Sequence, residues 1–396
     1  MVGSILIETS VIETEGEHIL KEPNMALVLN EDEVMLRDTA EGFFAEKAPV
    51  TALRKLRDTN DETGFDRALW SEMADMGFAG IAIGEDHGGV DMGFQAAGLL
   101  AEQMGRNLTA SPFLSTAILA ATVLREAGSD DQKSTWLPKI ASGETVMAVA
   151  LDEGPKHNPT GIETTAEKSG NGFKLNGAKA MVVDGHAADT LIVAAKTDDG
   201  IAFFLVDPKA KGVSIERTIM VDAHNAARID LDDVEVDGDA LIGESNSEDA
   251  LRKVLAAGRG VVAAELLGAG GEAFRSTVEY LKERKQFGVE IGTFQALQHR
   301  SSHLYTELEI CRSAVLGALT ALDAGDPKAD RYCSMAKAKL GDVAKLAALE
   351  GVQMFGGVGM TDEYDIGLFL KRVRVLQELL GDAAYHQNEH AKANKF

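Results

Sequence analysis

The spacing of apolar residues divides the chain into regions of different secondary structure. Across 27–142, apolar side chains recur at three- and four-residue steps, as at Leu53 and Leu56, which is typical of amphipathic helices. Across 145–245 the pattern changes to short β-type runs separated by turn residues. No helical pattern separates these runs, so they predict an antiparallel β-barrel or sandwich rather than βαβ units. The runs are TVMAVAL, FKLNGAKAMVV, TLIVAAKT, GIAFFLVD, GVSIERTIMV and ARIDLDDVEV.

Helical periodicity returns at residue 248 and continues in four long segments, the last with a His-containing tail. Their connections predict a four-helix bundle. The fold class is therefore α+β, with an N-terminal helical domain over 25–144, a middle β domain over 145–247 and a bundle over 248–396. Residues 1–24 form a short, polar and acidic stretch around one apolar patch, Ile5 to Ile7, and we predict a disordered extension or a start codon assigned too early, with Met25 the true start.

The charge of the chain restricts its partners. Its 39 Lys and Arg residues against 63 Asp and Glu residues give a net charge of −24, which argues against binding to nucleic acid or to an anionic membrane surface. We expect no transmembrane segment, because no run of about 18 apolar residues stands out. Cys311 and Cys333 form no zinc pattern or disulfide framework, so we predict no metal site and a cytoplasmic location.

Two motifs in the last third of the chain carry groups suited to binding a nucleotide. Arg284 offers a planar fork that suits a pyrophosphate. Gly356 and Gly357 let backbone N–H groups approach a phosphate closely, and Gln353 adds an amide donor. The first motif is Arg284-Lys-Gln-Phe-Gly288 followed by Phe294-Gln-Ala-Leu-Gln298, and the second is Gln353-Met-Phe-Gly-Gly-Val-Gly359 ending in Glu363-Tyr364.

In these motifs, and in the order of its domains from Met25 onward, the chain resembles the acyl-CoA dehydrogenase family. The resemblance implies α,β-desaturation of an acyl-CoA thioester, with a carboxylate that removes the α-proton and an FAD that accepts the β-hydride. It also implies that one subunit grips the ADP half of an FAD seated mainly in its dimer partner. The residues matching that role are Arg284, Phe287, Gln295, Gln353, Gly356 and Gly357.

The catalytic carboxylate is missing from both positions that the family uses. The family's Glu after the second motif falls on Leu380, and the alternative position early in the first bundle helix falls on Gly258. Neither residue can accept a proton. Arg259, beside Gly258, is a weak candidate for binding substrate.

Neighbouring acids could in principle replace the base. Glu378 and Asp382 each lie two residues from position 380, and on a helix such a displacement would turn the side chain by about 200°, away from the substrate. Asp382 is the better candidate if the segment is a loop. The alternative interpretation of both, and of Glu265, is solvated surface charge.

The half of the β domain that would face a flavin in this chain is also altered. By the resemblance, hydroxyl positions that would bond the flavin become Leu151 and His157, an aromatic becomes Met181, and a threonine becomes Val183. Each lost buried hydrogen bond costs about 1–3 kcal/mol, so several together weaken a flavin site by orders of magnitude. His157 itself is interpreted as a surface loop histidine.

The losses fall on one half of the expected site. The residues that would contact a flavin held by the same chain differ from those of the family. The residues that would reach a flavin held by a partner match the family. We therefore hypothesise that this chain is the non-catalytic subunit of a heteromeric acyl-CoA dehydrogenase. It would form a heterotetramer with a catalytic paralogue and share FAD with that paralogue. The complex would act on a lipid- or steroid-derived acyl-CoA and pass electrons to an electron-transferring flavoprotein. Two alternatives stay open: an active homo-oligomer with a displaced base, and a scaffold without redox function.

Overall fold

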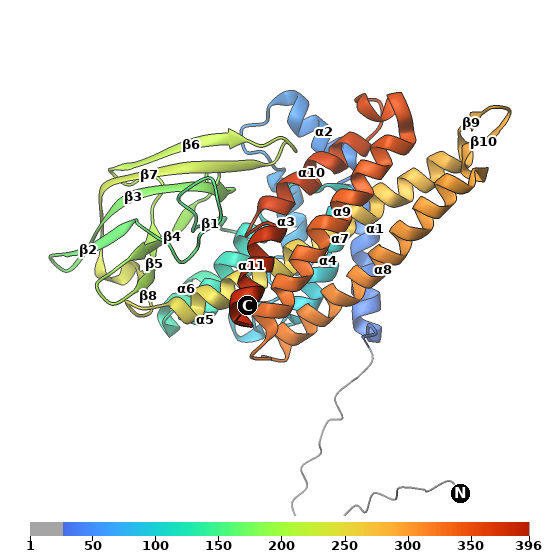
Figure 1. The fold of residues 1–396 in the computed structure, drawn as a ribbon. Coiled ribbons are helices and arrows are strands. Elements are labelled where there is room, and N and C mark those ends of the chain that lie inside the picture. The colour runs from blue at the N-terminus through green and yellow to red at the C-terminus, as the bar shows by residue number, and fades with distance from the viewer. Residues whose placement is uncertain (1–26, 396) are drawn as a thin grey trace, which may run out of the picture.

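The computed structural model describes residues 27–395, and this part begins with a helical domain (Figure 1). Asn30 and Ser129 start two of its helices with capping boxes, in which cap and third helical residue exchange hydrogen bonds. The segment 113–120, predicted as helix, forms a π-helix, η2. The prediction for 1–24 lies outside the described residues. The helices are α1 (Glu31–Lys47), α2 (Val50–Thr59), α3 (Arg67–Asp75), η1 (Glu85–His87), α4 (Gly93–Asn107), η2 (Phe113–Ala120), α5 (Ala121–Ala127) and α6 (Asp130–Ala141).

The middle domain is one eight-stranded sheet with the order β6-β7-β3-β2-β4-β5-β8, in which β1 also pairs with β4. All six predicted runs form strands, while β2 and β8 were not predicted. The pairings are antiparallel except β1 with β4 and β2 with β4, which are parallel. The strands are β1 (Met147–Ala150), β2 (Thr165–Ser169), β3 (Gly172–Val183), β4 (Thr190–Lys196), β5 (Ile201–Val206), β6 (Val213–Ile219), β7 (Asn225–Val236) and β8 (Leu241–Ile242).

The C-terminal domain is built around a 36-residue helix, α7. Contrary to our expectation from the sequence, α7 is long and apolar enough to cross a membrane, but 94% of its apolar window is buried inside the fold, as in a core helix. The fourth predicted segment and its tail form two helices separated at 379–382. The elements are α7 (Glu248–Glu283), the hairpin β9 (Lys285–Gln286) and β10 (Val289–Glu290), α8 (Gln295–Asp323), α9 (Ala329–Phe355), α10 (Ile366–Glu378) and α11 (Ala383–Ala393), with 3-10 turns η3 (Gly238–Ala240), η4 (Ile291–Thr293) and η5 (Gly356–Met360).

The two helical domains share one hydrophobic core. Buried residues of α4, such as Leu100 and Met104, belong to the same cluster as Val261 and Leu266 of α7, whereas most of the sheet interior forms a second cluster. Figure 1 shows the sheet at one side of the helices and the β9–β10 hairpin at the opposite end of the bundle. The helices thus form one body with the sheet attached to its flank.

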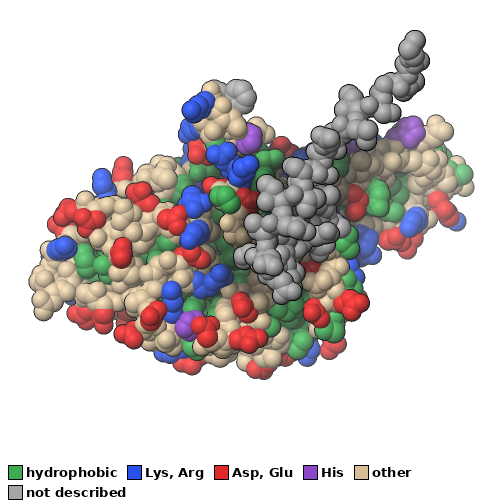
Figure 2. Space-filling view, turned by 90° about the horizontal axis from the view of Figure 1, so that it is seen from below, with side chains coloured by type: hydrophobic (Ala, Val, Ile, Leu, Met, Phe, Trp, Pro, Cys, Tyr) green, Lys and Arg blue, Asp and Glu red, His purple; other side chains and the backbone are tan. Residues whose placement is uncertain are grey.

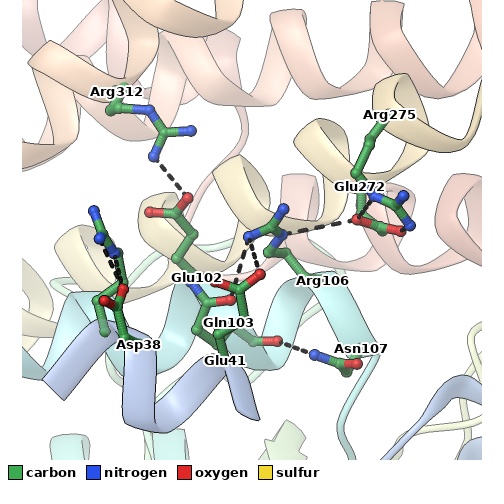
Figure 3. A network of polar contacts seen from close by, with 10 residues as sticks. Asp38, Glu41, Glu102, Gln103, Arg106, Asn107, Glu272, Arg275 and Arg312 are labelled. Atoms are coloured by element: carbon green, nitrogen blue, oxygen red, sulfur yellow. Dashed lines mark hydrogen bonds and ion pairs between the residues drawn. The ribbon is translucent and has the colours of Figure 1, made fainter. Parts of the chain in front are cut away.

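Charged side chains join the outer surfaces of the helices where the two helical domains meet (Figure 3). Arg312 of α8 pairs with Glu102 of α4 at 2.7 Å, and Arg106 of α4 lies between Glu41 of α1 and Glu272 of α7 at 3.6 and 3.7 Å. These pairs are partly exposed, so each contributes little to stability by itself. They fix the relative position of four helices.

Acidic side chains are spread over the face shown in Figure 2, including the sheet lobe at its left. Basic side chains gather nearer the middle of that face, among acidic ones. On this face the acidic side chains are therefore distributed rather than collected in one patch.

Candidate active site

A cavity of about 920 Å³ lies between the sheet, the N-terminal helices and the segment from α10 to α11. Apolar side chains form much of its wall, including Met104, Phe113, Leu114 and Val261. A volume of this size is ample for a cofactor or a substrate. The cavity is therefore the candidate active site of the chain.

The two positions at which the resemblance expects the base meet at this cavity. Leu380 lines it, is only 4% exposed, and has φ +58° in the left-handed region. A Cβ placed on Gly258 of α7 would lie 2.6 Å from Leu380 Cδ1 and 2.7 Å from Leu119 Cδ2. The leucine side chains thus fill the space that a carboxylate on α7 would need, and no proton acceptor stands at either position.

The two candidate replacement bases both line the cavity, because 379–381 is not helical. The expectation that a helix would turn them away was therefore wrong, but each carboxylate has another partner. Asp382 caps α11, and its Oδ1 accepts a hydrogen bond from Tyr385 N at 2.7 Å. Glu378 pairs with Arg374 at 2.5 Å, and its side chain is 52% exposed. Neither is held over the apolar part of the cavity as a buried base would be.

His157 is not the surface histidine that we expected, since its side chain is only 4% exposed. Its Nδ1 lies 2.8 Å from an Asp152 carboxylate oxygen, and its Nε2 lies 3.2 Å from Arg259 Nη2. Its ring also packs edge-on against Tyr385, with the centroids 5.0 Å apart. Both ring nitrogens of His157 are occupied, so neither is free to bind a flavin.

Arg259, the candidate for substrate binding, lies beside the cavity and faces protein groups. Its Nε donates to the Leu380 carbonyl oxygen at 3.3 Å, and its Nη2 donates to the Tyr385 hydroxyl at 3.3 Å. The guanidinium also lies 5.5 Å from the centroid of the Tyr385 ring. Arg259 therefore holds the loop after α10 and the start of α11 together.

The remaining flavin-facing positions are apolar, as the alignment by motif indicated. Met181 and Val183 line the cavity, and Met181 is 49% exposed. Leu151 is 5% exposed and packs in the core. These three side chains offer no donor or acceptor to a flavin ring.

The six residues predicted to bind the ADP half of a partner's FAD lie away from the cavity, around the bundle end that carries the β9–β10 hairpin. The ends of α7 and α9 meet there, because Tyr280 stacks on Phe355 at 4.2 Å and donates its hydroxyl to the Phe355 carbonyl oxygen at 3.3 Å. All six are exposed, and Phe287 is 91% exposed. The six are Arg284, Phe287, Gln295, Gln353, Gly356 and Gly357.

Three of these exposed residues keep free hydrogen-bonding side chains, since Arg284, Gln295 and Gln353 donate no side-chain hydrogen bond to any described residue. A Cβ added to Gly356 or Gly357 would meet no atom within 4 Å, so the backbone there borders open space. This end of the bundle therefore presents free donors and accessible backbone on the outside of the chain.

A buried ion network at the cavity was missed from the sequence. Arg372 of α10 donates to Glu265 of α7 at 2.5 and 2.9 Å and to Asp222 at 2.8 Å. Glu265 is 6% exposed, so interpreting it as surface charge was wrong. The signal was available: Glu265 interrupts the apolar run VVAAELLGA, and a lone charge in such a run requires a buried partner.

Asp184 also lines the cavity, at the end of β3. Its Oδ2 accepts a hydrogen bond from Ser115 Oγ of η2 at 2.7 Å. Burial raises the pKa of this carboxyl group to about 6, against the opposing effects of Ser115 and of the nearby His224 and Arg372. Asp184 was not among the sequence candidates.

Fold and cavity together define the class of the protein. A helical domain, a sheet and a helical bundle around one large cavity are the architecture of the acyl-CoA dehydrogenases. The models of the N-terminal, middle and C-terminal domains of acyl-CoA dehydrogenase match residues 30–144, 151–234 and 249–394. The chain belongs to this family.

Relatives extend over almost the whole chain. A 3-(aryl)acrylate reductase of Clostridium sporogenes is 31% identical over 91% of this chain and 98% of its own. The caffeyl-CoA reductase-Etf complex subunit CarC of Acetobacterium woodii is also 31% identical, over 91% of this chain and 97% of its own.

Solved structures of the same fold include two unlike pairs. A variant of the Tcur3481-Tcur3483 steroid ACAD has a TM-score of 0.84 and 30% identity, covering 92% of this chain and 99% of its own. The ChsE4-ChsE5 complex from Mycobacterium tuberculosis has a TM-score of 0.86 and 26% identity, covering 94% and 99%.

The cofactor of this family is FAD, and the residues of this chain fit its two halves differently. The positions that the resemblance assigns to the flavin ring offer it no free polar partner, because Met181 and Val183 are apolar and both nitrogens of His157 are occupied. The outer end of the bundle has the opposite character, with Arg284 and the open backbone at Gly356. The exposed end of the bundle thus suits the ADP half of an FAD held by another chain, whereas the flavin positions in the cavity of this chain suit a flavin ring poorly.

Proposed function

We propose that this chain is the non-catalytic subunit of a heteromeric acyl-CoA dehydrogenase. Its role is to complete the FAD site of a catalytic paralogue in a heterotetramer of the cytoplasm. The FAD held mainly by the paralogue would accept the hydride. Arg284, Gln353 and the backbone at Gly356 would bind the ADP half of that FAD and keep it in place.

The observation that carries the proposal is the contact between the two vacant base positions. Because Leu380 fills the space in front of Gly258, position 258 cannot hold a carboxylate without moving this wall, and position 380 itself is a leucine. Asp382 and Glu378, the displaced candidates, are engaged as a helix cap and as an exposed ion pair. An active homo-oligomer would have to give up one of these contacts before proton transfer.

The comparisons support pairing with an unlike chain and a bulky substrate. The ChsE4-ChsE5 complex and the Tcur3481-Tcur3483 steroid ACAD are each named as two proteins, and the second acts on steroids by its name. By analogy we propose a steroid- or lipid-derived acyl-CoA as the substrate of the complex. An electron-transferring flavoprotein is the proposed acceptor, in line with the Etf complex to which CarC belongs.

The test is to produce this chain alone and together with an acyl-CoA dehydrogenase paralogue encoded beside it, and to measure flavin per protein. We expect a colourless chain alone and one flavin per unlike pair in the complex. One flavin per isolated chain, with dye reduction by an acyl-CoA, would instead identify the active homo-oligomer. A pair that forms without any change in flavin content or activity would identify the scaffold.

Arg284→Gln in the complex gives a sharper measurement. Losing charge-assisted hydrogen bonds of about 1.5–3 kcal/mol should weaken FAD retention by at least about tenfold. Arg228→Gln on β7 is the matched control, because Arg228 is exposed and pairs only with Asp230 on the sheet surface. Equal FAD loss in both variants would contradict a specific role for Arg284.

A further inference from the structure

The inner wall of the cavity is polar, unlike the apolar wall around it. Five polar or charged residues, each no more than 9% exposed, line the cavity together. They come from distant parts of the chain and converge only in the fold. They are Thr109, Asp184, His224, Glu265 and Arg372.

Several of these groups retain unused hydrogen-bonding capacity. Both bonds from Arg372 to Glu265 go to Oε1, which leaves Glu265 Oε2 without a partner among the described residues. Asp184 accepts through Oδ2 from Ser115, and its Oδ1 likewise has no partner in the described chain. Of the five N–H groups of a guanidinium, Arg372 uses three in its hydrogen bonds, so two remain. Acceptors and donors therefore stand side by side.

Thr109 provides a second and independent indication. Its hydroxyl is buried and has no hydrogen-bond partner in the part of the chain that the structure describes. An unpaired buried hydroxyl costs about 1–3 kcal/mol, so native structures usually satisfy such a group. The Thr109 oxygen is closed off from the cavity, so it shows that the polar region is incompletely satisfied and is not itself a ligand contact.

The charges of the wall limit what that ligand can carry. The two carboxylates that pair with Arg372, those of Asp222 and Glu265, outnumber its single guanidinium, so a further anionic group would be repelled. An ammonium would need an ionised Asp184, and burial favours the neutral acid there. A neutral hydroxyl can donate to Asp184 or Glu265 and accept from Arg372, without adding a buried charge.

We propose that this cavity binds an apolar molecule that carries a hydroxyl group, with the hydroxyl placed against Asp184, Glu265 and Arg372. The apolar part lies along Met104, Phe113 and Val261. Because the chain has no base at Leu380, the molecule is bound and not converted, so the inference rests on the proposed function in this one respect. The cavity then acts as a binding site separate from the partner's active site.

The experiment uses four fluorescent probes that differ in one substituent: 1-pyrenemethanol, 1-methylpyrene, 1-pyrenemethylamine and 1-pyrenecarboxylic acid. Their affinity for the isolated full-length chain is measured by fluorescence anisotropy. We expect the alcohol to bind about tenfold more tightly than the methyl compound and more tightly than either charged probe. Equal binding of alcohol and methyl compound, or tighter binding of the amine or the acid, would overturn the proposal.

Two variants locate the binding and identify the hydroxyl partner. Ala101→Phe places a ring in the cavity and should abolish binding of every probe, whereas persistent binding would place the site elsewhere. Asp184→Asn keeps the shape and tolerates the left-handed backbone, with φ +56°. Its single amide oxygen can still accept from Ser115, which leaves an amide N–H₂ facing the alcohol.

In Asp184→Asn the tenfold preference for the alcohol should fall below about threefold. Asp232→Asn, on the exposed side of β7, is the matched control and should leave the preference unchanged. An unaltered preference in Asp184→Asn would refute the role of this carboxyl group. Binding is read on the isolated chain and the proposed function on the flavin content of the complex, so each can fail without the other.

Discussion

The contact between Leu380 and Gly258 can be measured as a coupling energy. In Gly258→Ala the new Cβ would lie 2.6 Å from Leu380 Cδ1, closer than side chains normally approach. Overpacking of this kind costs about 1–3 kcal/mol. Replacing Gly by Ala inside a helix by itself increases the free energy of unfolding by about 1 kcal/mol. We therefore expect a net loss of about 1 kcal/mol in the free energy of unfolding.

Leu380→Ala alone should cost about 2 kcal/mol, at the low end for a buried leucine, because its side chain already borders a cavity. If the two sites were independent, the double variant would lose about 3 kcal/mol. If they are in contact, the double variant is relieved of the clash with Leu380 and keeps the one with Leu119 Cδ2 at 2.7 Å, so about 2 kcal/mol is lost. The predicted coupling energy is therefore about 1 kcal/mol.

Urea unfolding of the full chain, followed by circular dichroism, measures all four proteins of this cycle. Gly271→Ala is the matched control on the same helix, because a Cβ there would meet no atom within 4 Å. It should stabilise the chain by about 1 kcal/mol and combine additively with Leu380→Ala. Additivity within about 0.5 kcal/mol for Gly258→Ala with Leu380→Ala would refute the contact.

Two further predictions concern buried charges. Burial lowers the pKa of Lys337 to about 7, so the unfolded chain binds more protons between pH 7 and 10 and stability should rise with pH there. In urea unfolding, the free energy of unfolding of the unsubstituted chain should rise by about 2 kcal/mol more than that of Lys337→Met between pH 7 and pH 9. If the free energies of the two proteins changed with pH in parallel, this prediction would be contradicted. Arg372→Leu should cost about 3–5 kcal/mol, because Glu265 loses its ion-pair partner and Asp222 keeps His224 as a partner. The exposed control Arg228→Leu should cost under about 0.5 kcal/mol, and similar losses in the two variants would argue against the buried network.

The order of domains and most elements followed from periodicity, which is a local property of the chain. The strands that escaped prediction lack that signal. In β2 only Ala166 is buried, so no apolar alternation exists, and β8 has only two residues. The parallel pairing of β1 with β4 also cannot be seen locally, because it joins segments some 40 residues apart, such as Met147 and Thr190.

The missing base could be read from motif positions alone, but the surroundings of that position could not. Glu265 and Arg372 are 107 residues apart, and His157 and Arg259 are 102 apart, so their pairing depends on how the domains pack. Glu378 would turn away from the cavity only on a helix that continued past it, and α10 ends at this residue. The cap at Asp382, a favoured capping residue, was the local signal that the helix is interrupted.

The loop after α10 keeps a strained shape although it carries no acid. Leu380 adopts φ +58°, which costs a non-glycine residue about 1–2 kcal/mol. Buried Lys337 donates to the carbonyl oxygens of Gln377 and Gly381, each at 2.9 Å, and Arg259 holds the Leu380 carbonyl. Two basic side chains from two helices thus fix a loop that has a leucine at its centre. These contacts hold Leu380 against Gly258 and keep the cavity wall rigid, which agrees with the binding role proposed for the cavity.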